Sequence, residues 1–302
     1  MKVKTEPSLP ARIIAANLRM AGIKQKTSFL QQYMKELSKK RPVRPPKILE
    51  KRIDISCEMF MGRNVWSLSA KESLCCQRIL YLHGGAYVVN FTLPHWLYMA
   101  ALAEHLHAVV IAPDYPLAPE QHASDVFAMM LPLYEKIIRE CGKENLSIMG
   151  DSAGGGMSLA LTQQLRDRAL PQPAHIMLLS PWLDITMSNP KITQVDKDDP
   201  ILNIKGLIES GKQYAGEIDR RDPRVSPIYG SLKGLAPITL FIGTADILLP
   251  DCRKLKVKAQ FEEHPIAYYE YEGMLHDGML YPIPEARDIR DKIVDILRCA
   301  QV

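Results

Sequence analysis

The feature that most constrains the fold is a regular alternation of short apolar runs with longer helical segments from residue 78 onward. Strands that alternate with helices imply crossover connections between parallel strands. We therefore predict an α/β fold with a mostly parallel central sheet and helices on both faces. The predicted strands cover residues 79–82, 109–112, 146–149, 176–179, 238–242 and 267–271, and the predicted helices cover 95–107, 124–140, 153–168, 251–263 and 285–299.

Two regions lie outside this alternation. Residues 9–40 have near-helical apolar spacing and end at a proline-rich linker, after which residues 51–60 and 63–69 predict an antiparallel strand pair. Residues 184–225 combine a polar loop with a helical run from Ile204 to Tyr214. We expect this second region to be an insertion over the carboxyl ends of the strands, where parallel sheets form their ligand sites.

Composition argues against several classes of function. A chain of 302 residues suits one large domain, alone or with a small cap. Its 38 basic and 34 acidic side chains leave a net charge of +4 without a basic, aromatic-rich stripe, so nucleic acid is not an expected partner. The sequence has no signal peptide or long apolar segment, which predicts a cytoplasmic protein without a stable membrane anchor. Its six cysteines lack zinc spacing, so no metal site is expected.

A candidate nucleophile lies in the segment Gly150-Asp151-Ser152-Ala153-Gly154, which directly follows a predicted strand and begins a predicted helix. In this place, G-x-S-x-G is typical of a nucleophile elbow, where serine occupies a sharp turn and small neighbours allow the bend. The helix N-terminus also directs N–H groups toward developing negative charge. The alternative is a glycine-rich turn without chemistry, because so short a pattern is common by chance.

A second glycine-rich segment, His83-Gly84-Gly85-Ala86, ends the predicted strand 79–82. Acyl transfer passes through a tetrahedral oxyanion, and adjacent small residues let backbone N–H groups approach it closely. An HGGG-type loop has this role in lipases and esterases. Together with the elbow, the segment predicts an oxyanion-binding loop rather than a simple glycine turn.

The serine also needs a base, because its hydroxyl is a poor nucleophile near neutral pH. Three histidines follow it in the chain. His175 begins a predicted core strand, and His264 lies at a helix–strand turn where we expect it to be exposed. His276 lies in the loop after the last predicted strand, from which its side chain can reach Ser152. His276 is therefore the predicted base.

The base in turn needs an orienting carboxylate. Asp246 follows the predicted strand 238–242, at the sheet edge where Ser152 should lie, and precedes His276 by one helix and one strand. Asp251 has the position of a cap for the next helix. Asp246 is the predicted acid, and Asp184 and Asp277 stay open as alternatives.

Together these segments resemble the hormone-sensitive-lipase family of α/β-hydrolases, above all its bacterial esterases and lipases. The resemblance covers about residues 78–290 and includes the sequences DYPLAPE at 114–120 and SPWLD at 180–184. It implies that Ser152 is the nucleophile, His276 the general base and Asp246 the orienting acid. The oxyanion hole that it implies consists of the backbone N–H groups of Gly85, Ala86 and Ala153, with Gly84 allowing the turn.

The resemblance also implies a division of the chain. Residues 1–45 would form an N-terminal helical cap segment, and residues 46–302 an α/β-hydrolase domain with a cap insertion at about 185–215. Because family members often form dimers, a homodimer is one assembly that it implies. Two positions depart from the family: Ala86 replaces a usual glycine, and Pro116 a usual arginine. We expect the first to restrict bulky substrates or reshape the alcohol side of the pocket, and the second to affect structure only.

The predicted function is that of a serine carboxylesterase, which hydrolyses short- to medium-chain acyl esters through an acyl-enzyme. Its partner would be a small-molecule ester, and the reaction needs no cofactor. Deacetylation or amide hydrolysis by the same triad is one alternative. The other is a ligand-binding protein without turnover, since the family resemblance includes a plant hormone receptor that has lost its catalytic histidine. Here Ser152, Asp246 and His276 are all present.

Overall fold

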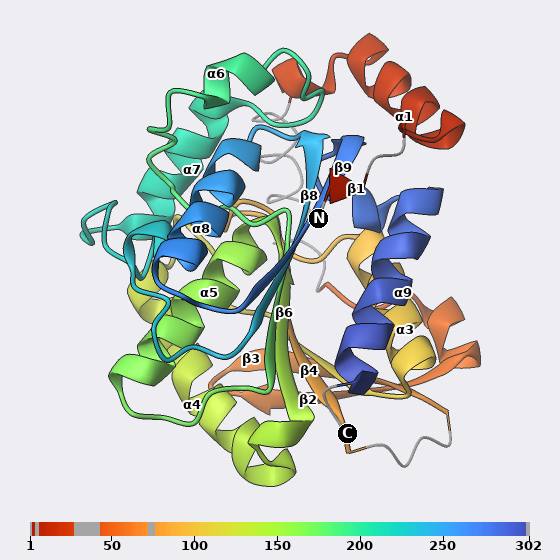
Figure 1. The fold of residues 1–302 in the computed structure, drawn as a ribbon. Coiled ribbons are helices and arrows are strands. Elements are labelled where there is room, and N and C mark those ends of the chain that lie inside the picture. The colour runs from red at the N-terminus through yellow and green to blue at the C-terminus, as the bar shows by residue number, and fades with distance from the viewer. Residues whose placement is uncertain (1, 4–5, 27–42, 72–75, 300–302) are drawn as a thin grey trace.

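The structure of the protein is a computed structural model that describes residues 2–3, 6–26, 43–71 and 76–299 (Figure 1). Within these ranges a nine-stranded sheet has the order β1-β9-β8-β7-β6-β4-β5-β3-β2. The strands from β1 to β5 in this order are parallel, and β3 and β2 continue the sheet antiparallel. The bounds are β1 Lys2–Val3, β2 Ile53–Phe60, β3 Arg63–Ala70, β4 Arg78–Leu82, β5 Val109–Pro113, β6 Leu146–Asp151, β7 His175–Leu179, β8 Ile238–Ala245 and β9 Ile266–Leu275.

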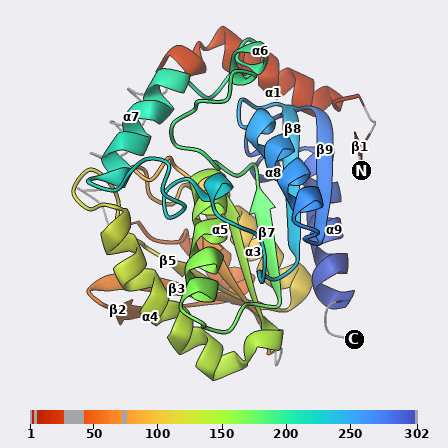
Figure 2. The same ribbon diagram turned by 60° about the vertical axis from the view of Figure 1, so that its left-hand side comes forward.

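Helices cover both faces of the sheet, which confirms the predicted α/β fold. α4, α5 and α8 lie on one face, and α3 and α9 on the other (Figures 1 and 2). Their bounds are α3 Leu93–Leu106, α4 Ala123–Cys141, α5 Ser152–Asp167, α8 Leu249–Phe261 and α9 Pro284–Cys299. Other helices of the described residues are α1 Leu9–Met20, α6 Ile192–Val195 and α7 Ile204–Ala215, and residues 23–26 are also helical. Within the described ranges, no helix combines the length and the apolar character needed to cross a bilayer.

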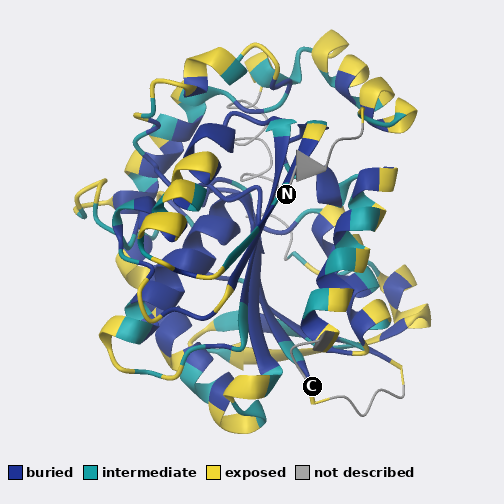
Figure 3. Cartoon of the chain, viewed as in Figure 1, coloured by how far each residue is buried: buried dark blue, intermediate teal, exposed yellow. Residues whose placement is uncertain are grey.

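The central strands are buried on both faces, which explains their nearly continuous apolar sequences (Figure 3). In β4, Leu80 and Leu82 join the core beneath α4, α5 and α8, whereas Ile79 and Tyr81 join the core beneath α3 and α9. Successive side chains of a strand point to opposite faces, so a strand between two helical layers needs an apolar residue at every position.

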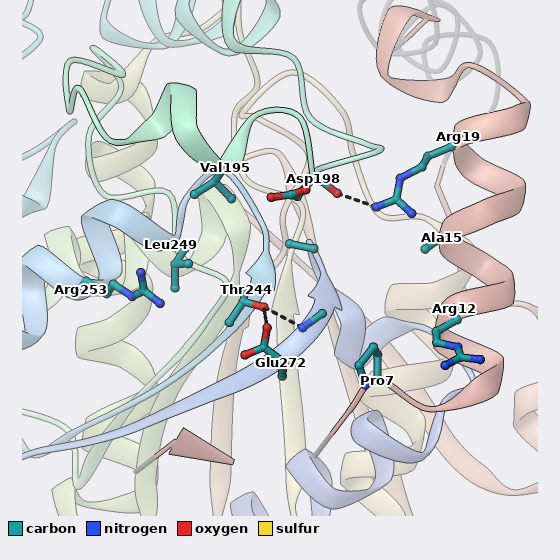
Figure 4. A pocket seen from close by; sticks show the side chains of 12 residues that line it. Pro7, Arg12, Ala15, Arg19, Val195, Asp198, Thr244, Leu249, Arg253 and Glu272 are labelled. Atoms are coloured by element: carbon teal, nitrogen blue, oxygen red, sulfur yellow. Dashed lines mark hydrogen bonds between the residues drawn. The ribbon is translucent and has the colours of Figure 1, made fainter. Parts of the chain in front are cut away.

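The pairing of β8 with β9 is irregular just before the ends of both strands. Gly243 pairs with Tyr271 and Ala245 with Leu275, so β9 advances four residues while β8 advances two. Gly273 lies in the extra length with a positive φ of 63°, and its N–H donates to the Thr244 hydroxyl at 2.7 Å (Figure 4). This is a bulge in β9, and it immediately precedes the loop that carries His276.

α1, α6 and α7 lie across the carboxyl ends of the parallel strands (Figures 1 and 2). Arg19 of α1 donates to the carbonyl of Asp198 at 2.9 Å, and the Lys24 ammonium lies 2.8 Å from the Asp196 carboxylate. A cavity of about 580 Å³ separates α1 from the ends of β8 and β9, and Arg12 and Arg19 line it opposite Glu272 (Figure 4). The N-terminal segment and the insertion therefore meet above the sheet.

The structure differs from the sequence prediction at three places. Within the predicted helical region 9–40, a turn at Gly22, whose φ is +62°, interrupts the helix after Met20, residues 23–26 are helical again as predicted, and residues 27–42 lie outside the described residues. The two-residue strand β1 was not predicted. α8 begins two residues earlier than predicted and has Leu248 at its N-cap, so the prediction that Asp251 caps this helix is wrong. Instead, Asp251 accepts a hydrogen bond of 2.8 Å from the Asn189 amide.

Candidate active site

Ser152 lies at the sharp turn between β6 and α5, with a positive φ of 49°. This turn brings backbone segments so close that side chains would collide. A Cβ atom at Gly154 would lie 1.9 Å from the carbonyl oxygen of Leu82, and one at Gly150 would lie 2.4 Å from that of Gly154. The two glycines of the G-x-S-x-G sequence are thus required by the geometry of the elbow.

The structure brings Ser152, His276 and Asp246 into one hydrogen-bonded chain. The Ser152 Oγ lies 3.0 Å from Nε2 of His276, and Nδ1 of His276 lies 2.8 Å from Oδ2 of Asp246. All three side chains are buried. They come from the start of α5 and from the first positions after β8 and β9, at the same edge of the sheet.

Hydrogen bonds fix the orientation of the histidine ring. The Asp246 carboxylate also accepts the N–H of Leu248 at 2.9 Å, which holds it beneath the ring. Because Nδ1 faces a carboxylate, its proton resides on that nitrogen, and Nε2 carries the lone pair that faces the serine hydroxyl. Burial disfavours the imidazolium form, but the carboxylates of Asp277 and Asp246 outweigh burial and raise the pKa of His276 well above its ordinary value.

The predicted oxyanion loop follows β4 and lines the same cavity as Ser152 through Gly85 and Ala86. Ala86 and the next residue, Tyr87, both have left-handed backbone conformations, with φ of 53° and 63°. Ala153 lies in the first turn of α5, where an N–H has no acceptor within its own helix. These three N–H donors, of Gly85, Ala86 and Ala153, are those that the resemblance assigned to the oxyanion hole.

Gly84 contributes to this loop in another way. Its N–H donates to Oδ2 of Asp151 at 2.9 Å, so it is not available to an oxyanion. A Cβ at Gly84 would lie 2.2 Å from the same carboxylate oxygen. Gly84 therefore allows the loop to close on the elbow, and it should not be counted among the oxyanion donors.

Buried polar side chains that the sequence did not identify support the loop from below. The Asp151 carboxylate accepts a hydrogen bond from Tyr81 at 2.6 Å and lies 3.2 Å from Nε2 of His95. Burial opposes the charged form of His95, but this carboxylate outweighs it and raises the pKa of His95. His83 stacks on Tyr115 with ring centroids 4.2 Å apart, and burial lowers its pKa to about 3, so it stays neutral.

A largely apolar cavity of about 320 Å³ opens above Ser152 and His276. Its walls come from the oxyanion loop, the start of α3, the N-terminal segment at Ile23, the insertion at Leu202 and Leu207, and the segment that follows β9. This volume is at the lower end of the range for small-molecule sites. The cavity therefore suits a compact, mainly apolar substrate.

The other candidates from the sequence lie elsewhere or in other roles. His175 contacts the Thr239 hydroxyl at 2.8 Å inside the sheet, and burial lowers its pKa to about 4. His264 is buried rather than exposed as predicted, because the turn after α8 folds back onto the sheet. Asp184 accepts hydrogen bonds from Thr186 and Tyr229 and does not contact His276 in the structure. Asp277 does contact His276, but through Nε2 at 3.1 Å rather than through Nδ1.

One buried carboxylate near the site carries no recognisable sequence signal. Asp199, in the insertion, accepts the backbone N–H of Ile247 at 3.0 Å and that of Leu202 at 2.9 Å. Burial, together with the neighbouring Asp246 carboxylate, raises its pKa to about 6. Asp199 thus joins the insertion to the loop that holds Asp246.

The described residues contain no group of three or more His, Cys, Asp or Glu side chains arranged to hold a metal ion. Four of the six cysteines have described side chains, and all four are free thiols: Cys57, Cys76, Cys141 and Cys252. Cys75 and the side chain of Cys299 lie outside the described residues.

Comparison with known proteins gives a consistent result. Residues 79–280 match the family of the α/β-hydrolase fold. An esterase of Acinetobacter venetianus is 32% identical over 72% of this chain and 73% of its own length, and an acetyl-hydrolase of Streptomyces hygroscopicus is 30% identical over 69% and 71%. The crystal structure of EstE5 soaked with p-nitrophenyl butyrate covers 97% of this chain and 99% of its own, with a TM-score of 0.85 at 26% identity. The chain therefore belongs to the α/β-hydrolase family, as its resemblance to the hormone-sensitive-lipase type indicated.

Proposed function

We propose that the protein is a serine carboxylesterase that hydrolyses short- to medium-chain acyl esters through an acyl-enzyme intermediate. One observation carries the proposal: the linked Ser152, His276 and Asp246 open onto an apolar cavity of about 320 Å³. The relatives named esterase and acetyl-hydrolase support the same reaction class. The modest volume favours short acyl groups over long ones.

In the acylation step, the Ser152 oxygen attacks the ester carbonyl carbon while Nε2 of His276 accepts the hydroxyl proton. Asp246 keeps the ring in the productive tautomer and stabilises the imidazolium that forms. The negative charge on the former carbonyl oxygen is bound by the N–H groups of Gly85, Ala86 and Ala153. When the tetrahedral intermediate collapses, the alcohol leaves with the proton from His276.

Deacylation repeats these steps with water as the nucleophile. His276 removes a proton from water, hydroxide attacks the acyl-enzyme carbonyl, and the Ser152 oxygen takes the proton back as the carboxylic acid leaves. No metal or cofactor takes part in either half of the reaction.

We further propose that residues 1–45 and the insertion at about 185–215 act together as a cap over the hydrolase domain, residues 46–302. Part of the cavity wall comes from Ile23 of the N-terminal segment and from Leu202 and Leu207 of the insertion. These contacts support a cap role for the described residues of both segments. The cap would then determine which acyl chains fit. A cytoplasmic location and a homodimer stay predictions from the sequence.

The test is hydrolysis of p-nitrophenyl esters from acetate to decanoate by the wild type, by Ser152→Ala and by the exposed-serine control Ser188→Ala. We expect the wild-type rate to peak among the short to medium chains and the Ser152→Ala rate to fall by roughly 10⁴- to 10⁶-fold. Ser188→Ala should match the wild type. A well-folded wild type without turnover would favour amide or acetyl-sugar substrates, and then a binding protein.

A further inference from the structure

Nε2 of His276 has two polar neighbours at nearly the same distance. The Ser152 Oγ lies at 3.0 Å and the Oδ2 of Asp277 at 3.1 Å. The opposite ring nitrogen, Nδ1, faces Asp246 at 2.8 Å. The ring therefore lies between two carboxylates, of which only Asp246 contacts the nitrogen that an orienting acid should hold.

The role of the Asp277 carboxylate follows from where the protons of the His276 ring lie. Nδ1 carries a proton because it donates to Asp246, so a neutral ring has only a lone pair at Nε2. Two lone pairs do not attract, and the contact with Asp277 is favourable only when one proton lies between Nε2 and Oδ2. That proton occupies the electron pair that must accept the proton of Ser152. Protonation between His276 and Asp277 and activation of Ser152 thus exclude each other.

The surroundings of Asp277 favour retention of this proton. The acidic groups that face the pair come from β6, from the insertion and from the loop after β8, namely Asp151, Asp199 and Asp246. The other titratable groups around the pair are His95, Tyr281 and Tyr81, which donates to Asp151 from β4. Four carboxylates therefore share a buried site with two imidazoles, His95 and His276. Burial raises the pKa of Asp277, and its Oδ1 is a buried atom without a recorded hydrogen-bond partner in the described chain.

The backbone holds Asp277 in this position. Its φ is 52° and its ψ 35°, a left-handed conformation that asparagine and glycine also adopt readily. Its N–H donates to the Ser180 hydroxyl at 3.3 Å, which links it to the loop after β7. The carboxylate is thus directed at Nε2 by the chain itself.

We propose that Asp277 is a positioning residue that retains a proton on Nε2 of His276 in the free enzyme, so that Ser152 is activated only at a pH high enough to release this proton to solvent. The inference rests on the proposed function and adds to it a carboxylate that sets the acidic side of the activity profile. Asp246 orients the ring, whereas Asp277 controls when its other nitrogen becomes available.

The first experiment measures kcat/KM for p-nitrophenyl butyrate from pH 5 to pH 10, because this ratio reports the ionisation of the free enzyme. The variants are Asp277→Asn and Asp277→Gly, and the control is Glu272→Gln, which removes a charge from the exposed part of β9. We expect both Asp277 variants to move the acidic midpoint down by about one pH unit or more. Relative to the plateau, their kcat/KM on the acidic side should rise about fivefold to tenfold, and the control should not shift.

A second measurement separates this inference from the proposed function. The ¹⁵N shifts of the His276 ring can be titrated without substrate in the wild type, so the result does not depend on turnover. We expect His276 to titrate above the ordinary value of about 6.5 and to titrate lower in either Asp277 variant. A wild-type ring that titrates at or below 6.5, or a midpoint that neither variant moves, would overturn the inference. Absence of ester hydrolysis with the expected titration would instead count against the proposed function.

Discussion

Two helices, α5 on one face of the sheet and α1 across the carboxyl ends of its strands, differ sharply in how they are held (Figure 1). Thirteen of the sixteen residues of α5 are buried, whereas α1 buries only Ala11 and Ala15 among its twelve (Figure 3). The elbow at the start of α5 is fixed by backbone atoms in direct contact. α1 and the segment that follows it are joined to the insertion by long polar side chains, namely Arg19 in α1 and Lys24 after it.

This difference in packing matches a difference in how accurately the two regions must position their atoms. For the proposed reaction, the catalytic platform, which we define as the elbow, the oxyanion loop and the loops that carry Asp246 and His276, must hold reacting atoms within fractions of an ångström. The proposed cap needs only to enclose the substrate. Substitutions in the platform should therefore be far more damaging than equally drastic ones in the cap.

Apart from removal of the serine hydroxyl, the largest effect is expected at the Asp246 carboxylate of the platform. Asp246→Asn should lower kcat by about 10⁴-fold, because an amide cannot hold the ring in the productive tautomer. Asp184→Asn is the matched control for a buried aspartate and should cost about 1–3 kcal/mol of unfolding free energy by loss of accepted hydrogen bonds, with kcat retained. Chemical denaturation and steady-state kinetics measure both effects. If Asp184→Asn lost the activity and Asp246→Asn kept it, the roles would be reversed.

Next in size is a single methyl group in the elbow. Gly154→Ala should cost about 3 kcal/mol or more of unfolding free energy, because its Cβ would lie 1.9 Å from the Leu82 carbonyl oxygen. Gly62→Ala, at the turn after β2, has no recorded heavy atom within 4 Å of the new Cβ. Only its left-handed φ of +79° is costly, at about 1 kcal/mol. If urea unfolding showed the same loss of unfolding free energy in Gly154→Ala and Gly62→Ala, the close backbone contacts of the elbow would not be what makes Gly154 necessary.

Asp199 tests the join between platform and cap. Asp199→Asn should cost about 1–3 kcal/mol, because an amide nitrogen would face the N–H of Ile247. The pKa of Asp199 is raised to about 6 in the folded protein. The protonated carboxyl therefore stabilises the wild type fully below the pKa of the unfolded state, near 4, and this contribution is lost as the pH rises through about 6. The difference in stability between variant and wild type should therefore change over that window and stay constant above it. A difference independent of pH would contradict this assignment.

A smaller change is expected at the oxyanion loop from Ala86→Gly. Ala86 lines the cavity with a φ of 53°, so glycine removes a methyl group and a strained backbone position together. Esters of branched alcohols should gain about tenfold in kcat/KM, with linear esters little changed. Unchanged rates on both series would count against a role of Ala86 in limiting bulky substrates.

The smallest effect is expected in the cap. Lys24→Met removes the ion pair with Asp196 at a partly exposed site and should cost less than about 1 kcal/mol. Lys26→Met is the control, since that ammonium donates to the carbonyl of Ala21 on its own segment. Thermal unfolding and kcat/KM at low and high salt are the measurements. A loss of unfolding free energy comparable with that of Gly154→Ala would remove the distinction between the two regions.

The sequence predicted the platform better than its supports, for a physical reason. The elbow needs two glycines beside the serine, and the positions of Asp246 and His276 follow from where strands end, so local pattern was sufficient. The contact of His95 with Asp151 and that of Asp199 with Ile247 join residues distant in the chain, and no spacing rule predicts such pairs. The same limit explains the unpredicted strand β1 and the burial of His264, both of which depend on tertiary packing.

The bulge in β9 has a consequence for how such an enzyme can vary. If β9 kept its length but paired regularly with β8 beyond Tyr271, Asp246 would lie level with Met274, and His276 would lie two residues too far along the strand to meet it. The bulge takes up two extra residues of β9, an even number, so it sets His276 back along the strand without turning its side chain to the other face of the sheet. The loops beyond β8 and β9 can therefore vary in length. Within the two strands, residues can be inserted or removed only in even numbers if His276 is to stay on the same face of the sheet. The relative position of Asp246 and His276 is thus set by the residue count of β8 and β9 rather than by the loops that carry the two side chains.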